Sequence, residues 1–183
     1  MNCEASRKPR AAIRVSFLAD HPEVLPLVAR WLHRQFLAAQ GFSRAGVAVA
    51  LRERLRRSEP PIGMVAYLGR YPAGTVSITV DRLPGEADAQ HLTLSGLYVV
   101  PRARNRGAGA MLCQAAVCLA AQAGAPSLWL CTATAETWFQ RLGWCTTASE
   151  LVALGPRSVM ANCMRREITA RDGDNERGPH AND

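Results

Sequence analysis

The sequence predicts an α/β protein of the α+β type, with a mixed, mostly antiparallel sheet of six to seven strands and about four flanking helices. Two observations support this class. Segments typical of strands and helices follow one another in the order β-α-α-β-β-β-α-β-α-β-β, which is not the strict alternation of a parallel sheet. A glycine-rich turn at residues 102–109 joins a strand, an apolar helix and a further strand, which predicts one parallel crossover.

Apolar periodicity and turn residues define the individual elements. The expected strands cover residues 13–17, 64–68, 75–80, 92–100, 128–131, 144–152 and 158–164. The expected helices cover residues 22–39, 44–57, 107–123 and 136–142. The turn at residues 69–74 makes the second and third strands a hairpin, and residues 81–90 are expected to form a polar loop.

Capping and stop residues justify the helix boundaries. Asp20 and Ser43 are expected to be N-cap residues of the first two helices, and Pro60-Pro61 stops the second. The third helix is almost entirely apolar, so we expect it to be buried, and Gly124 ends it. The fourth helix is short and ends at Gly143.

The length of 183 residues indicates one domain. We expect a flexible N-terminus over residues 1–10, one domain over residues 11–167 and a disordered polar tail over residues 168–183. No apolar run is long enough for a membrane span or typical of a signal peptide, so we expect a cytoplasmic protein without a membrane partner. The six cysteines lack zinc spacing, so we expect reduced thiols and no metal; a catalytic Cys131 is the alternative.

The net charge of +7 predicts an anionic partner. A nucleic acid is not favoured, because no aromatic side chains interleave with the arginines to form a stacking platform. The four arginines within residues 52–57 are interpreted as a solvated helix face. Arg102, Arg104 and Arg106 in the glycine-rich turn suit a small polyanion better.

The strongest functional signal lies in residues 94–123, which read LSGLYVVPRARNRGAGAMLCQAAVCLAAQA. The turn leaves the backbone N–H groups of residues 106–110 free at the positive end of a helix dipole, where a phosphate binds well. Gly107 and Gly109 have no Cβ, so a ligand can approach the main chain, and the arginines add positive charge. The alternative is an ordinary tight turn, with Gly for packing and Arg for solubility.

Two other phosphate-binding loops do not fit these residues. A nucleoside-triphosphate loop needs Lys and then Ser or Thr after its last glycine, whereas Ala110 and Met111 follow Gly109. A dinucleotide fingerprint needs a third glycine, where this chain has Leu112. It also needs an acid at the end of the next strand, which here ends in Cys and Thr.

These features, in this order, resemble the GNAT superfamily of acyl-CoA N-acyltransferases over roughly residues 12–166. The family's turn reads Arg/Gln-x-x-Gly-x-Gly/Ala, which Arg104, Gly107 and Gly109 fill. The preceding LYVVP resembles the family's fourth strand, and TWFQRLGW at residues 137–144 resembles the family segment FYERLGW. The resemblance implies acetyl-CoA as cofactor and transfer of the acetyl group to a primary amine.

The resemblance also implies positions that bind the cofactor. The backbone of Leu97, Tyr98 and Val99 is expected to pair with the amides of the pantetheine arm, as a strand edge pairs with a peptide. Thr132 matches a position where the family often places a small polar residue, although it could equally be a capping residue. The pyrophosphate is expected on the turn formed by Arg104, Asn105, Arg106, Gly107, Ala108, Gly109 and Ala110.

Acetyl transfer needs a neutral amine, a stabilised oxyanion and a protonated leaving thiolate. An alkyl-ammonium has a pKa of about 10, so a base must remove its proton. The candidate bases are Asp81, which could instead cap a turn, and His91, which could instead be structural; Glu86 and Asp88 are interpreted as solvated. The backbone N–H of Val99 or a neighbour is the implied oxyanion donor.

The chain departs from the family pattern at Phe139, where the usual thiolate-protonating Tyr would stand. Tyr98, Cys131 or water could supply this proton, or the thiolate could leave unaided. The departure leaves a second hypothesis, an acyl-CoA sensor with little catalysis, and the +7 charge motivates a third, acetylation of charged tRNA. The expected partner is a small-molecule or peptide amine, attracted by acids in residues 81–90, and the expected assembly is a monomer or homodimer.

Overall fold

The structure, a computed structural model, describes residues 12–83, 86–154 and 157–173. The strands are β1 (Ile13–Phe17), β2 (Ile62–Leu68), β3 (Tyr71–Leu83), β4 (Glu86–Val99), β5 (Ser127–Thr132), β6 (Cys145–Leu154) and β7 (Arg157–Glu167). The α-helices are α1 (Leu25–Leu32), α2 (Arg44–Arg52), α3 (Ala108–Gln122), α4 (Glu136–Gln140) and α5 (Ala170–Gly173).

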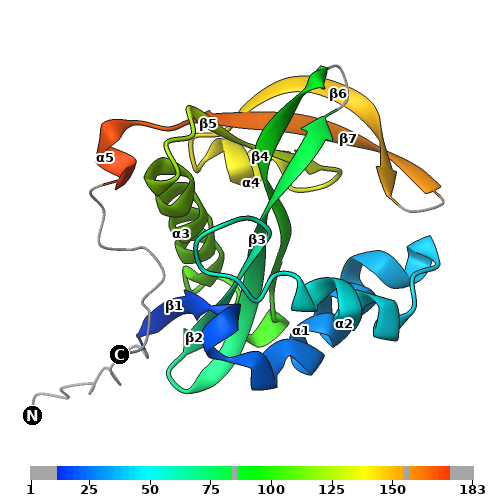
Figure 1. Cartoon of the computed structure of the whole chain (residues 1–183), viewed down its shortest axis with the longest axis vertical. Coiled ribbons are helices and arrows are strands. Elements are labelled where there is room, and N and C mark those ends of the chain that lie inside the picture. The colour runs from blue at the N-terminus through cyan, green and yellow to red at the C-terminus, as the bar shows by residue number, and fades with distance from the viewer. Residues whose placement is uncertain (1–11, 84–85, 155–156, 174–183) are drawn as a thin grey trace, which may run out of the picture.

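The strands form a single sheet in the order β1-β2-β3-β4-β5-β7-β6. Every neighbouring pair is antiparallel except β4 and β5, which run parallel and are joined by α3. Figure 1 shows α3 on one side of the central strands and α1 and α2 on the other. The predicted fold class and its parallel crossover are confirmed, with five α-helices among the described residues where about four were expected.

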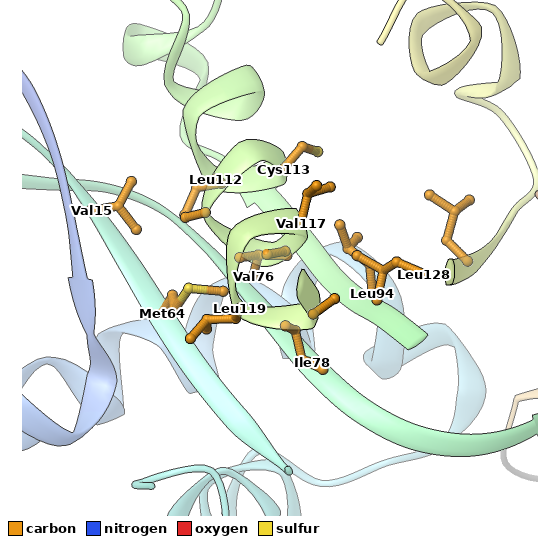
Figure 2. Packing of buried hydrophobic residues seen from close by; sticks show 14 of the residues in the cluster. Val15, Met64, Val76, Ile78, Leu94, Leu112, Cys113, Val117, Leu119 and Leu128 are labelled. Carbon is orange, nitrogen blue, oxygen red and sulfur yellow. The ribbon is translucent and has the colours of Figure 1, made fainter. Parts of the chain in front are cut away.

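The apolar helix α3 packs against the centre of the sheet. Leu112, Ala116 and Val117 have no exposed surface, and a fully buried Leu or Val side chain contributes about 1.5–3 kcal/mol. Figure 2 shows Leu112 and Val117 on the side of the helix that faces Val15, Met64, Val76, Ile78, Leu94 and Leu128 from strands β1 to β5, and Ala116 belongs to the same cluster. Because α3 is held along its length, its N-terminus has a fixed position beside the end of β4.

Residues 81–90 do not form the predicted loop. β3 and β4 stay paired up to Leu83 and Glu86, and Asp81 faces His91 across the pair. The prediction is wrong because the backbone of this polar segment stays paired in the sheet, and its Leu83 side chain is buried. Its Asp81 and Arg82 side chains are exposed, so polar residues occur there without interrupting the strand.

The first predicted helix is shorter and less regular than its apolar spacing suggested. Turns of 3-10 helix precede and follow α1, and His33–Leu37 form a π-helical turn. Asp20 does not cap this helix; its carboxylate is 2% exposed and pairs with Arg57. Pro22 and Pro26 lack the N–H groups that an earlier start would use, which is consistent with the late beginning of α1.

The second helix begins as predicted and ends early. Ser43 caps α2, since its Oγ accepts a hydrogen bond from the Gly46 N–H at 3.0 Å. The helix ends at Arg52 rather than near residue 57. The arginines after Arg52 therefore lie outside the helix, where Arg54 contacts Ser77 and Arg57 contacts Asp20.

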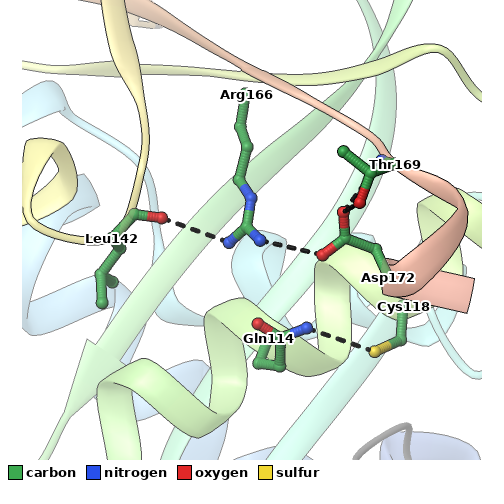
Figure 3. Close-up of polar contacts among 6 residues, drawn as sticks. All are labelled: Gln114, Cys118, Leu142, Arg166, Thr169 and Asp172. Carbon is green, nitrogen blue, oxygen red and sulfur yellow. Dashed lines mark hydrogen bonds and ion pairs between the residues drawn. The ribbon is translucent and has the colours of Figure 1, made fainter. Parts of the chain in front are cut away.

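The chain continues in helical structure past residue 167, where the sequence predicts a disordered tail. Arg166 donates to the Leu142 carbonyl at 3.2 Å and to the Asp172 carboxylate at 3.0 Å (Figure 3). The Thr169 N–H and hydroxyl also donate to Asp172, at 2.9 and 2.7 Å. These bonds hold α5 in place, so the prediction is wrong for residues 168–173. Residues 1–10 and 174–183 of the predicted N-terminus and tail lie outside the described residues.

We expect Asp172→Asn to destabilise the protein in a pH-dependent way. Desolvation alone would raise the pKa of Asp172, but the hydrogen bonds from Thr169 and the charge of Arg166 outweigh it and lower the pKa. A lowered folded-state pKa contributes stability above the ordinary value of about 3.9, and this is lost as pH falls through the folded value. The free energy of unfolding should therefore drop by about 1–3 kcal/mol at pH 7. Denaturant titrations should show the difference between variant and wild type vanishing in acid, whereas an equal difference at every pH would mean that packing alone is lost.

Candidate functional site

The parallel strands β4 and β5 diverge from each other. In the described part of the sheet they share one register pair, Thr93 with Trp129. On its other edge β4 stays paired with β3 as far as Val99. Backbone groups of β4 beyond Thr93 therefore face a side with no strand partner, as the cofactor prediction for Leu97, Tyr98 and Val99 requires.

A bulge marks the point where β4 changes register. Thr75 pairs with Tyr98 while Ser77 pairs with Ser95, so Gly96 and Leu97 together face a single residue of β3. Gly96 has a φ of +61°, which favours glycine. The bulge re-aims the backbone of β4 at the start of the unpaired segment.

The turn between β4 and α3 leaves the helix start without a cap. Asn105 has a φ of +57° and Gly107, the residue before α3, has a φ of +94°. The first helical hydrogen bond runs from Met111 N–H to the Gly107 carbonyl, and no side chain caps the N-terminus. The amides of Ala108, Gly109 and Ala110 therefore precede the helical ladder and are available to an anion.

The two arginines and the two glycines of this turn have different structural roles. Arg104 is exposed and donates from Nε to the Val99 carbonyl at 3.1 Å, which ties the turn to the end of β4, while Arg106 is exposed. A Cβ on Gly109 would lie 3.2 Å from the Trp138 ring. Gly109 therefore makes room for Trp138, and Gly107 is the glycine that the backbone conformation of the turn requires.

Thr132, the last residue of β5, and Phe139 in α4 have structural roles. The Thr132 hydroxyl accepts a hydrogen bond from the Ala135 N–H at 3.1 Å, so the capping alternative is present in the structure. Phe139 is 5% exposed, with its ring 4.9 Å from that of Trp138 and 5.8 Å from that of Trp144. The departure at Phe139 thus places an apolar side chain in the core.

The other candidate acids are also constrained. The Tyr98 ring lies 5.8 Å from the Trp31 ring and packs among apolar residues of the α1 side. The thiols of Cys131 and Cys163 lie 2.8 Å apart across β5 and β7. Burial, with the Cys163 hydrogen bond, raises the pKa of Cys131 to about 12, so Cys131 stays protonated at neutral pH.

Asp81 and His91 form a cross-strand pair, with the His91 ring 4.9 Å from that of Trp129. Asp81 comes four residues after Ser77 along β3, a distance of about 13 Å. Asp81 is therefore too far from the bulge for direct contact with a group bound there. The structure does not gather Asp81, His91 and Tyr98 in one place.

Two hydroxyls connect Asp81 with the bulge. Thr79 Oγ1 donates to Asp81 Oδ2 at 2.5 Å and lies 3.5 Å from Ser95 Oγ, next to Gly96. We call Ser95, Thr79 and Asp81 the hydroxyl row. Sequence reasoning missed Thr79 and Ser95, because only the β3–β4 register brings them together.

Arg54 is a further residue that sequence reasoning missed. It is only partly exposed, unlike the solvated face predicted for residues 52–57. Its Nη1 donates to Ser77 Oγ at 3.0 Å, and burial lowers its pKa despite the nearby charges of Asp81 and Glu53. Arg54 comes three residues after the buried Leu51, and this helical spacing could have indicated that Arg54 faces inward.

Neither a membrane-spanning helix nor a metal site is found within the described residues. No helix in those ranges combines the length and the apolar character needed to cross a bilayer. The same residues contain no group of three or more His, Cys, Asp or Glu side chains that could hold a metal ion.

Residues 25–144 match the family model described as the acetyltransferase (GNAT) family. The chain therefore belongs to the GNAT acetyltransferase family. A search of curated proteins finds no match.

Solved structures share the fold at low sequence identity. The acetyltransferase of GNAT family from Streptococcus pneumoniae is 20% identical, with a TM-score of 0.62 over 86% of this chain and 100% of that one. Ard1 from Thermoplasma volcanium is 20% identical, with a TM-score of 0.63 over 86% and 99%. The putative acetyltransferase yncA from Salmonella typhimurium, 16% identical with a TM-score of 0.62 over 87% and 95%, is described with its cofactor acetyl-CoA.

Proposed function

We propose that the protein is an acetyl-CoA-dependent N-acetyltransferase that acts on a primary amine by direct attack, without a covalent enzyme intermediate. The observation that carries this proposal is the uncapped N-terminus of α3 beside the unpaired edge of β4. Membership of the acetyltransferase family supports the group transferred. The bound acetyl-CoA in yncA supports the cofactor by analogy of fold.

The residues of the turn fit the pyrophosphate of this cofactor. The amides of residues 106–110, with the helix dipole, would hold its negative charge, and Arg104, Asn105 and Arg106 would line its outer side. The backbone of Leu97 to Val99 would pair with the pantetheine amides. When bound, the cofactor supplies an activated acetyl group as a thioester. Thr132 remains a cofactor-side candidate through its position at the end of β5.

The hydroxyl row would remove the proton from the acceptor ammonium. With the one hydroxyl proton of Thr79 directed to Asp81, Ser95 would take the ammonium proton and turn its own proton toward Thr79 Oγ1, 3.5 Å away, as Thr79 passes its proton to Asp81. Asp81 is exposed, so it can return the proton to water. In this role Asp81 acts as the base over a distance that direct contact cannot span. His91, which faces Asp81 across the strand pair, is the second proton-accepting group at this end.

The leaving thiolate would take its proton from water. Phe139 has no proton to give, the Tyr98 ring packs against Trp31, and Cys131 keeps its proton because its pKa is about 12. The amine nitrogen also releases a proton when the amide forms. Protonation of the thiolate therefore needs no acidic side chain of the protein.

Steady-state release of free thiol from acetyl-CoA across a panel of primary amines tests the function. We expect turnover with at least one class of small-molecule or peptide amine and a matching N-acetylated product by mass spectrometry. Saturable cofactor binding without turnover on any amine would instead support an acyl-CoA sensor. Salt-sensitive binding of charged tRNA with acetylation of its amino group would support the tRNA-directed alternative.

A further inference from the structure

Arg54 lies beside the bulge of β4. Its Nη1 is 3.9 Å from the position that a Cβ on Gly96 would take and 3.0 Å from Ser77 Oγ. Its carbonyl accepts a hydrogen bond from the Gly63 N–H at 2.9 Å, which anchors the residue to β2. The guanidinium is therefore placed at the start of the unpaired segment of β4, where the proposed function puts the reacting amine.

This cation forms no ion pair among the residues that the structure describes. Its hydrogen-bond partner there is the neutral hydroxyl of Ser77, although a guanidinium has five N–H donors. The charges of Asp81 and Glu53 act on it from outside ion-pair distance, and burial lowers its pKa in spite of them. A partly buried guanidinium without a carboxylate partner is costly for the folded protein, so a role with a ligand is a physical reason to retain it.

Arg57, three residues after Arg54, has the carboxylate partner that Arg54 lacks in the described part of the chain. Its guanidinium is paired with the buried Asp20 carboxylate and its side chain is 56% exposed. The charge of Arg57 is therefore satisfied within the fold, whereas the guanidinium of Arg54 lies against Ser77 of β3, beside the bulge of β4.

We infer that Arg54 binds a carboxylate of the acceptor, and that the acceptor class is therefore α-amino acids or compounds with a carboxylate close to the amine. The planar fork of a guanidinium suits a carboxylate, which it can hold with two parallel hydrogen bonds. Because Ser77, the hydrogen-bond partner of Arg54, is paired with Ser95 across the two strands, a carboxylate held by Arg54 would bring an amine one carbon away toward Ser95, the first member of the hydroxyl row. This inference rests on the proposed function for the amine end of the acceptor.

The test compares α-amino acids with the amines that lack only the carboxylate, such as leucine with 3-methylbutylamine. For the wild type, kcat/KM should be higher with the amino acid of each reactive pair. Arg54→Met should raise KM for the amino acid by about 10- to 100-fold, since hydrogen bonds between charged groups are worth about 1.5–3 kcal/mol. It should leave kcat/KM for the amine within about twofold. Arg54→Lys should fall between the two, because it keeps the charge and loses the fork.

Arg52→Met is the matched control, because Arg52 is exposed on α2 and its loss changes the net charge equally. An equal loss of kcat for both acceptors of a pair in Arg54→Met would overturn the inference and indicate a role in stabilising developing charge on the thioester. A wild-type preference for the amines would also overturn it.

A binding measurement separates failure of the inference from failure of the proposed function. Amino acids are titrated calorimetrically into the protein with coenzyme A present. Saturable heat that Arg54→Met abolishes and Arg52→Met preserves supports the carboxylate site, even if no amine is acetylated. Turnover on amines without any such heat overturns the inference and leaves the proposed function standing.

Discussion

Gly107→Val is expected to weaken acetyl-CoA binding by roughly 100-fold. Gly107 has a φ of +94°, which a β-branched residue adopts only at a cost of about 1–3 kcal/mol, so the turn would rearrange. Rearrangement turns the amides of Ala108 and Gly109 away from the pyrophosphate. Each hydrogen bond to a charged group contributes about 1.5–3 kcal/mol, and 1.4 kcal/mol is a tenfold change in Kd. Isothermal titration calorimetry with acetyl-CoA measures the change.

Gly124→Val is the matched control for this variant. Gly124 follows the other end of α3 and has a φ of +70°, and a Cβ at this position would meet no surrounding residue within 4 Å. Its substitution carries a similar backbone penalty and should lower the melting temperature similarly, with little effect on Kd. Equal loss of affinity in both variants would mean that general destabilisation of α3, and not the anion site, explains the result.

Asp81→Asn is expected to lower kcat by about 100-fold or more, the range of a general base. The amide can still accept the Thr79 hydrogen bond but cannot take up the proton. The KM for acetyl-CoA should stay unchanged, because Asp81 lies about 13 Å along β3 from Ser77 at the bulge. The rate of the variant should rise with pH toward about 10, since more acceptor amine is then neutral without help. Steady-state kinetics over this pH range provide the measurement.

Variants of Thr79 show whether Asp81 acts through the hydroxyl row. Thr79→Val removes the middle hydroxyl and should reduce kcat to a similar extent, whereas Thr79→Ser keeps it and should retain most activity. If Thr79→Val keeps full activity while Asp81→Asn does not, the proton takes another route. If neither changes kcat, Asp81 is a structural residue at the end of the hairpin.

The elements that could be predicted from the sequence are those whose signal is local and apolar. The first strand matches its predicted bounds, and α3 differs by one residue at each end, because a buried segment shows its periodicity and its glycine stops directly. The hairpin over residues 81–90 could not be predicted in this way. The side chains of Asp81, Arg82, Ala89 and Gln90 are all exposed and so lack the alternation of a half-buried strand, and the pairing of β3 with β4 is not visible in the local sequence.

In the candidate site, too, only the features that depend on neighbouring residues in the sequence could be predicted. The turn before α3 and the free amides at the start of this helix could be predicted, because both follow from a few consecutive residues. The left-handed conformations of Asn105 and Gly107 are seen only in the structure. The positions of Arg54, Thr79 and Ser95 could not. They depend on the bulge at Gly96 and on the register between strands that are distant in sequence, and a shift of one residue would turn Ser95 to the other face.

We propose above all that the N-terminus of α3 binds the pyrophosphate of acetyl-CoA. The most direct measurement is a calorimetric titration of acetyl-CoA into the wild-type protein, with Gly107→Val and Gly124→Val measured under the same conditions. We expect saturable binding of one molecule per chain, which Gly107→Val loses and Gly124→Val keeps. A folded wild-type protein that gives no heat and no rise in melting temperature at millimolar acetyl-CoA would contradict it.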